Sequence, residues 1–198
     1  MGDIVGILLA AGSGSRFGGD KLLHSLADGR PLALAAVAGL QAACARVVAV
    51  VRPGDGELAA TLAAAGCEVV VAAEAALGMG HSLAAGVRAT AGAAGWLVGL
   101  ADMPCIAEDT YRLVADALRA GHAIAAPCCD GRRGHPVGFA ARWYEALTAL
   151  AGDAGARALL AAFADCVHLI TVADPGIATD IDRPADLAAL VAQNPATA

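Results

Sequence analysis

The feature that most constrains this chain is the stretch Ile4–Lys21, IVGILLAAGSGSRFGGDK. An apolar run, Ile4–Leu9, passes directly into a loop that contains four glycines and the cations Arg16 and Lys21. Glycine lets the backbone come close to a ligand with its N–H groups turned inward, and fixed cations neutralise phosphate oxygens. The stretch therefore predicts a buried strand followed by a phosphate-binding loop.

Two common phosphate-binding motifs do not fit this loop. The dinucleotide fingerprint G-x-G-x-x-G/A, counted from Gly12, places its third small residue at Phe17. A Walker loop requires G-K-[ST], but Asp20 precedes the lysine, and Leu22 stands where a hydroxyl would hold magnesium. Both motifs fail at positions on which their chemistry depends.

The composition excludes several classes of protein. The chain has 198 residues, which is enough for one well-buried domain over 1–198. Its formal net charge of −6 at pH 7 argues against a surface that coats nucleic acid. Glycines and charged residues interrupt every apolar run before it reaches membrane-spanning length, and the start MGDIVG has no basic region. We therefore expect a cytoplasmic protein without nucleic-acid or membrane partners.

Six cysteines are present, and none of them forms a C-x-x-C pair. In a chain that we do not expect to be secreted, buried free thiols are favoured over disulfides or a metal site. Cys128 and Cys129 are adjacent and are the one pair for which a redox assay is worthwhile. Their role stays open.

Short apolar runs alternate with segments of helical composition. Strands are expected over 4–9, 46–51, 68–73, 96–101, 122–127 and 167–172, and a basic, glycine-rich hairpin or loop over 130–135. Helices are expected over 31–43, 57–65, 81–90, 108–119, 142–150, 152–163 and 184–192, and 137–140 leads into the fifth of them. This alternation indicates an α/β fold, a three-layer α/β/α sandwich around a mostly parallel, Rossmann-like sheet.

In such a sheet the ligand binds at the carboxyl ends of the strands. The loop after Leu9, the loop after Ala73, and Asp102 after the fourth apolar run all fall at that edge. The order of the elements and the phosphate-binding loop therefore indicate one shared cleft.

The pattern L-A-A-G-x-x-x-R-x-G-x-x-K over Leu9–Lys21 resembles the signature of the nucleotidyltransferases with a MobA-like fold. The resemblance covers nearly the whole chain and includes the later motifs GMGHSL (78–83), LADMP (100–104), GHPVGF (134–139), GDAGAR (152–157) and DIDRP (180–184). In combination they are most similar to the molybdenum cofactor cytidylyltransferases. The resemblance implies a sheet of the nucleotide-diphospho-sugar transferase type, with a nucleotide-binding half over about 1–105 and an acceptor-binding half over about 106–192.

The choice of base rests on one residue. Guanylyl-transferring relatives usually carry L-A-G-G, whereas this chain has Ala11 at the third place. Glycine is smaller than alanine and leaves room for a larger base such as guanine. Ala11 therefore favours a pyrimidine, and the resemblance implies CTP. Relatives often carry Asn or Asp just after the third strand, in contact with the nucleotide. Here Glu74 either replaces that contact or the contact is missing.

The reaction that the resemblance implies is attack by the phosphate of molybdopterin on the α-phosphate of CTP, with release of pyrophosphate. A phosphomonoester has a second pKa of about 6 and is mostly dianionic near neutral pH, so no general base is needed. Alignment and charge neutralisation then carry the catalysis.

The resemblance also implies a role for each matching residue. Arg16 would bind the β- and γ-phosphate oxygens through its planar fork, Lys21 would stabilise charge at the α-phosphate, and Asp102 would complete the catalytic set. Asp102 and Asp182 would bind Mg²⁺, a hard cation that prefers one or two carboxylates plus phosphate oxygens. The nucleotide-binding residues that the resemblance implies are Leu9, Ala10, Ala11, Gly12, Arg16, Lys21, Gly80, His81 and Ser82. The resemblance implies His135, Asp153 and Arg157 as acceptor-binding residues, although Asp153 and Arg157 could equally only start and stabilise a helix.

These residues also have ordinary structural interpretations. Arg16 and Lys21 could be surface cations, and Asp102 could cap the turn before the next proline. Asp182 could favour the N-terminus of the last helix. A histidine in a Gly-Pro turn, such as His135, could be purely structural.

Two other functions stay open. An oxidoreductase on the same scaffold would use NAD(P)H to reduce a pigment-like heterocycle, although the dinucleotide fingerprint is absent. A non-catalytic carrier would hand molybdopterin to a molybdenum-enzyme partner or chaperone, although such a protein needs neither Lys21 nor Asp102. Titration of CTP and GTP with and without Mg²⁺ separates these functions. The sequence leaves the acceptor and the oligomeric state open.

Overall fold

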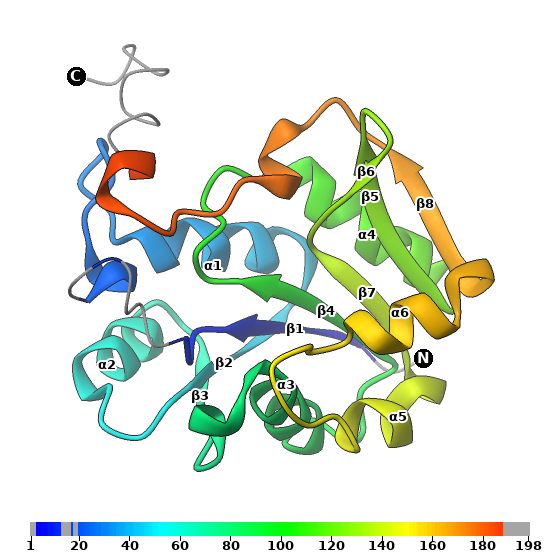
Figure 1. The fold of residues 1–198 in the computed structure, drawn as a ribbon, viewed down its shortest axis with the longest axis horizontal. Helices are drawn as coiled ribbons and strands as arrows, with labels where there is room; N and C mark the ends of the chain where they lie inside the picture. The colour runs from blue at the N-terminus through cyan, green and yellow to red at the C-terminus, as the bar shows by residue number, and fades with distance from the viewer. Residues whose placement is uncertain (1–2, 13–16, 18–19, 188–198) are drawn as a thin grey trace.

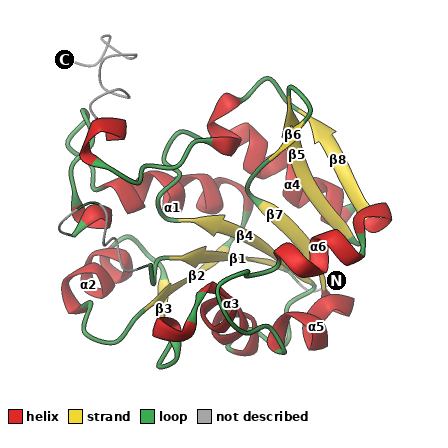
Figure 2. Cartoon of the chain, viewed as in Figure 1, coloured by secondary structure: helices red, strands yellow, loops and turns green. Residues whose placement is uncertain are grey.

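The structure is a computed structural model that describes residues 3–12, 17 and 20–187. It contains one sheet with helices packed on both faces (Figure 1, Figure 2). The strands are β1 (Ile4–Leu9), β2 (Arg46–Val51), β3 (Glu68–Val71), β4 (Gly95–Leu100), β5 (Ile124–Cys129), β6 (Arg132–Arg133), β7 (Val137–Ala140) and β8 (Val167–Thr171). The α-helices are α1 (Leu32–Ala43), α2 (Gly56–Ala64), α3 (Met79–Arg88), α4 (Glu108–Arg119), α5 (Tyr144–Thr148) and α6 (Arg157–Ala162).

The sheet is mostly parallel, as predicted. Its strand order is β3-β2-β1-β4-β7-β5-β6, and β8 pairs with β5. β1 lies between β2 and β4 and is parallel to both. The pairs β2–β3 and β5–β8 are also parallel. The carboxyl ends of β1, β2 and β4 therefore lie side by side at one edge of the sheet.

Two strands run against the others. β7 is antiparallel to β4 and β5, and β6 is antiparallel to β5. Residues 137–140, expected only to lead into a helix, thus form a strand in the middle of the sheet. The segment 130–135 is a hairpin, because Asp130 and Gly131 form a two-residue connection with φ of 50° and 74°. Two positive φ values give a turn whose twist matches that of an antiparallel strand pair.

Burial on both faces explains the three layers. All six residues of β1 are buried, so this strand needs cover on each side. On one face α1 and α4 pack against the sheet through buried side chains such as Leu40 and Tyr111. On the other face α3, α5 and α6 contribute Leu83, Leu147 and Leu160 (Figure 1). The α/β/α sandwich is confirmed.

Helix boundaries differ from the prediction where glycines have positive φ. The segment 152–163 was expected to be one helix, but α6 begins only at Arg157. Gly152 and Gly155 have φ of 67° and 52°, values that a continuous right-handed helix does not contain. Each helix within the described residues is too short or too polar to cross a membrane.

All six cysteines are free thiols, as expected. Cys44 and Cys67 are buried. The expectation of burial is wrong for Cys166, which is exposed because it ends a short 3₁₀ turn at the surface before β8. Cys128 and Cys129 are only partly buried, since they lie near the open end of β5.

Candidate functional site

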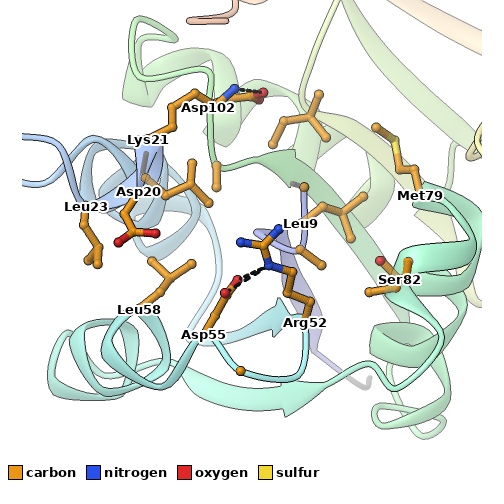
Figure 3. A pocket seen from close by; sticks show the side chains of 18 of the residues that line it. Leu9, Asp20, Lys21, Leu23, Arg52, Asp55, Leu58, Met79, Ser82 and Asp102 are labelled. Atoms are coloured by element: carbon orange, nitrogen blue, oxygen red, sulfur yellow. Dashed lines mark hydrogen bonds and ion pairs between the residues drawn. The ribbon is translucent and has the colours of Figure 1, made fainter. Parts of the chain in front are cut away.

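A cavity of about 580 Å³ opens at the carboxyl ends of β1, β2 and β4 (Figure 3). The loops that follow β1, β3 and β4 all contribute to its wall, through Gly12, Ala75 and Asp102 among others. The structure thus brings together the three loops that the sequence placed at one edge. The first turn of α3 closes one side of the cavity with Met79 and Ser82.

Lys21 links two carboxylates at this cavity. Its Nζ atom donates to Oδ2 of Asp102 at 2.9 Å and to Oδ1 of Asp182 at 3.4 Å. The Lys21 side chain is 9% exposed, whereas those of Asp102 and Asp182 are 28% and 40% exposed. A buried ammonium group is stable only when it is paired, so the two carboxylates account for the burial of Lys21.

The backbone brings the C-terminal segment to this point. The N–H group of Ile181 donates to the carbonyl oxygen of Asp102 at 2.9 Å, which holds Asp182 beside the end of β4. The backbone N–H groups of Asp182 and Arg183 both donate to Oδ2 of Asp186, at 2.9 and 2.7 Å. Asp186 thus accepts from the start of this helical turn, and the carboxylate of Asp182 turns towards Lys21.

The two carboxylates form a site that suits a hard divalent cation. Both contact the same ammonium group, so they converge, and both are partly exposed. Asp102 lines the cavity, whereas Asp182 lies outside its lining. Mg²⁺ is usually held by one or two carboxylates, with phosphate oxygens and water completing its shell. In the described part of the chain no group of three or more His, Cys, Asp or Glu side chains converges. Asp102 and Asp182 fit a cation that is completed by a bound phosphate.

The backbone after β1 is only partly available to a ligand. The carbonyl of Leu9 accepts from the N–H of Ala101, and the N–H of Ala10 donates to the carbonyl of Val50. Leu9, Ala11 and Gly12 line the cavity, whereas Ala10 is buried and does not. The prediction for Arg16 lies outside the described residues.

Of the three nucleotide-binding residues predicted from the second glycine motif, one lines the cavity and two do not. Ser82 lines the cavity. Gly80 is covered, because its N–H donates to the carbonyl of Gly152 at 2.8 Å. His81 lies outside the cavity lining, with its Nδ1 3.3 Å from Oε2 of Glu74. Glu74 also lies outside the lining, so it contacts the histidine instead of facing the cavity.

The predicted acceptor residues also lie in different environments. Asp153 lines the cavity, whereas Arg157 is exposed at the start of α6 and does not. His135 is held by its backbone N–H, which donates to the carbonyl of Ile177 at 2.9 Å. Its buried Nδ1 has no hydrogen-bond partner within the described residues. Burial lowers the pKa of His135, although a backbone hydrogen bond at Val98 and the charge of Asp102 oppose that shift.

An ion pair that no sequence motif indicated lies in the cavity wall. Nε of Arg52 donates to Oδ1 of Asp55 at 3.0 Å, and both residues line the cavity from the loop after β2 (Figure 3). From the sequence, Arg52 and the Pro-Gly pair after it are expected only to end the strand. The available signal was the position of Arg52 directly after a buried strand, which is the same signal that identified Asp102.

Comparison with known proteins identifies relatives along nearly the whole chain. The model of the MobA-like NTP transferase domain matches residues 6–167. The nicotine blue oxidoreductase of Paenarthrobacter nicotinovorans is 32% identical over 195 residues, which are 92% of this chain and 96% of that protein. The bifunctional protein GlmU of Geobacter metallireducens is 39% identical over 124 residues, 59% of this chain. The match spans only 25% of that longer protein.

A solved structure has the same fold. Rv0371c from Mycobacterium tuberculosis H37Rv superposes with a TM-score of 0.83 at 25% identity, covering 96% of this chain and 98% of that one. A second structure of Rv0371c, in complex with manganese, superposes with a TM-score of 0.71 at 24% identity over 86% of this chain and 88% of that one. The arrangement of strands and helices described above is therefore shared with Rv0371c.

Proposed function

Since the chain belongs to the MobA-like NTP transferase family, we propose that it transfers CMP from CTP to the phosphate of molybdopterin and releases pyrophosphate. The observation that carries this proposal is the position of Lys21 between Asp102 and Asp182 at the end of β4. A cation and two carboxylates beside a glycine-rich loop are the groups that a triphosphate and its metal ion require. The family supports nucleotidyl transfer, and the base and the acceptor are our proposal.

The proposed reaction needs few groups from the protein. An oxygen of the acceptor phosphate forms a bond to the α-phosphorus of CTP, and the bond from that phosphorus to the oxygen bridging to the β-phosphate breaks. Pyrophosphate leaves with the electron pair. The acceptor is already mostly dianionic, because its second pKa is about 6, so no side chain has to remove a proton. The protein supplies alignment and charge.

Lys21 is the residue that would stabilise charge at the α-phosphate. Its ammonium group is buried and contacts Asp102, so it would lie near a phosphate bound beside that carboxylate. Removal of one such charge-stabilising group typically lowers the rate by on the order of 100-fold or more. Arg16 would bind the β- and γ-phosphate oxygens from the loop after β1.

Asp102 and Asp182 would hold Mg²⁺. When bound, a divalent ion neutralises charge on the triphosphate and on the pyrophosphate that leaves. The structure of Rv0371c with manganese supports a divalent cation in a protein of this fold. Ser82 and Asp153, which line the same cavity, would contact the nucleotide and the acceptor respectively. His135 and Arg157 stay candidates for the acceptor half, about 106–192.

The test is a reaction with CTP, Mg²⁺ and molybdopterin in which pyrophosphate release is measured. We expect release that depends on all three components. Chelation of the metal should stop it, and a Lys21→Met variant should slow it strongly. Absence of pyrophosphate release from CTP, GTP, UTP and ATP alike would contradict the proposal.

One observation favours a second candidate, an oxidoreductase. The nicotine blue oxidoreductase matches this chain over 92% of its length. In that function a hydride would pass from NAD(P)H to a heteroaromatic ring, and solvent would supply the proton. Loss of NAD(P)H absorbance in the presence of such a heterocycle, without any nucleoside triphosphate, would favour this candidate over nucleotidyl transfer.

A further inference from the structure

We propose that Arg52 and Asp55 form a base-reading pair, which recognises the edge of cytosine that carries the exocyclic amino group. This inference deepens the proposed function and rests on it, because it concerns the base of the nucleotide that the same cavity would bind. The pair belongs to the loop after β2, which no predicted motif includes.

The pair is fixed and faces the cavity. Nε of Arg52 lies 3.0 Å from Oδ1 and 2.9 Å from Oδ2 of Asp55. The Asp55 side chain is 18% exposed and that of Arg52 is 35% exposed. Since Nε holds the carboxylate, the terminal Nη groups remain for a ligand, and no acceptor among the described residues takes a hydrogen bond from them. Figure 3 shows the guanidinium directed into the cavity between Asp55 and Leu9.

The register of the sheet places this pair beside the residue on which the choice of base depends. Leu9 of β1 lies opposite Val50 of β2 in the parallel ladder. The N–H of Ala10 also donates to the carbonyl of Val50. Ala11 and Arg52 each follow these paired residues by two or fewer positions, and both line the cavity. A base held over Ala11 would therefore present its edge to the arginine one strand away.

The charge at this end of the cavity favours a base over a phosphate. The charges of Arg52 and Asp55 cancel, and Asp20 and Glu57 also line the cavity. Lys21, the other described cation in the lining, is engaged by Asp102 and Asp182. A triphosphate placed against Asp55 would meet like charge, whereas a neutral heterocycle would meet a donor and an acceptor side by side.

The hydrogen-bonding pattern of the pair matches cytosine in one pose. A carboxylate only accepts hydrogen bonds and a guanidinium only donates them. Cytosine carries an amino donor next to the acceptor N3, so Asp55 would accept from the amino group while Arg52 donates to N3. Uracil in the same pose presents a carbonyl to Asp55 and an N–H to Arg52, and both contacts are lost. Unpaired polar groups of this kind are the basis of strong discrimination.

The experiment compares the binding of CTP, UTP and inorganic tripolyphosphate, each with Mg²⁺, by calorimetric titration. The proteins are the wild type, Asp55→Asn, Arg52→Gln and the control Arg46→Gln. Arg46 is a matched control because it also forms an ion pair with a carboxylate, with its Nε 2.6 Å from Oε1 of Glu68. The two residues begin β2 and β3, at the end of the sheet away from the cavity. We expect the wild type and the control to prefer CTP. Each loop variant should lower the ratio of CTP to UTP affinity by about tenfold or more and leave tripolyphosphate affinity unchanged.

Each other outcome overturns the inference in a recognisable way. If the loop variants weaken CTP, UTP and tripolyphosphate equally, the pair contacts phosphate. If both variants keep the wild-type ratio while circular dichroism shows them folded, the pair does not read the base. A wild type that binds tripolyphosphate and both nucleotides equally well overturns the base-reading pair and leaves nucleotidyl transfer standing. If the wild type binds none of the three ligands, both the proposed function and the base-reading role of the pair are contradicted.

Discussion

The ammonium group of Lys21 lies 2.9 Å from the carboxylate of Asp102, although 81 residues separate them in the sequence. The lysine follows the loop after β1 and the aspartate follows β4, and the two strands are parallel neighbours. Their loops therefore emerge at the same edge of the sheet. The same ammonium group also contacts Asp182, which lies 161 residues further along the chain. One buried cation thus joins three distant segments at the cavity.

The first prediction concerns the rate of nucleotidyl transfer. Lys21→Met keeps the length of the side chain and removes its charge. We expect pyrophosphate release to fall by about 100-fold or more, because charge at the α-phosphate loses its partner. Arg46→Gln, which removes an exposed cation from the far edge of the sheet, should retain wild-type activity. Equal activity in the wild type and Lys21→Met would remove Lys21 from the mechanism.

The second prediction concerns metal binding without nucleotide. In the structure the Lys21 ammonium contacts both carboxylates, so it would compete with a divalent cation for them. Lys21→Met should therefore bind Mn²⁺ more tightly, by about fivefold, which corresponds to about 1 kcal/mol for a partly exposed ion pair. Asp102→Asn should weaken binding instead. The measurement is a Mn²⁺ titration followed by electron paramagnetic resonance. Weaker binding by Lys21→Met than by the wild type would contradict this account.

The third prediction concerns Gly80, which has a packing role. A Cβ atom at this position would lie 2.7 Å from the carbonyl oxygen of Ala151. Gly80→Ala should therefore lower the free energy of unfolding by about 1–3 kcal/mol, because rigid backbone has to move. The matched control is Gly92→Ala, since nothing lies within 4 Å of a Cβ there. Denaturant titration of both variants tests the difference, and equal stability would show that the segment at Ala151 yields easily.

The fourth prediction concerns thiol reactivity. Burial raises the pKa of Cys44 to about 12, whereas Cys166 is exposed. At about pH 8 a thiol reagent should modify Cys166 rapidly in the folded protein and Cys44 only after unfolding, since the thiolate is the reactive form. Cys166→Ser should remove the rapid phase. Mass spectrometry of the labelled peptides identifies the modified residues, and early labelling of Cys44 would contradict its burial.

The fifth prediction concerns the Cys44 thiol and the loss of stability at alkaline pH. The pKa of Cys44 is higher in the folded chain than its ordinary value of 9.0. The unfolded chain therefore loses this proton first. The contribution of Cys44 to stability is complete below pH 9.0 and is lost as the pH rises towards about 12. In denaturant titrations Cys44→Ala should show a smaller decrease between those two pH values than the wild type, and an equal decrease would contradict the assignment.

The sequence by itself determined the class of fold and the general place of the site. Runs such as Ile4–Leu9 and residues 47–51 are apolar along their whole length, which is typical of a strand covered on both faces. Their alternation with helices indicated a mostly parallel sheet and hence a cleft at the carboxyl ends. Lys21 and Asp102 were identified from that reasoning together with the motif. Local composition was sufficient because burial on two faces is a property of each strand alone.

Only the tertiary structure decided which residues meet. The antiparallel direction of Val137–Ala140 depends on its partners β4 and β5. A run of four apolar residues does not indicate whether the strand is parallel or antiparallel to its neighbours. Arg52 and Asp55 belong to no predicted motif, and only the tertiary structure shows that they line the same cavity as Ala11. Asp182 reaches Lys21 because the backbone of Ile181 bonds to Asp102. Contacts between residues far apart in the sequence follow from strand order and loop paths, which depend on how the whole chain packs.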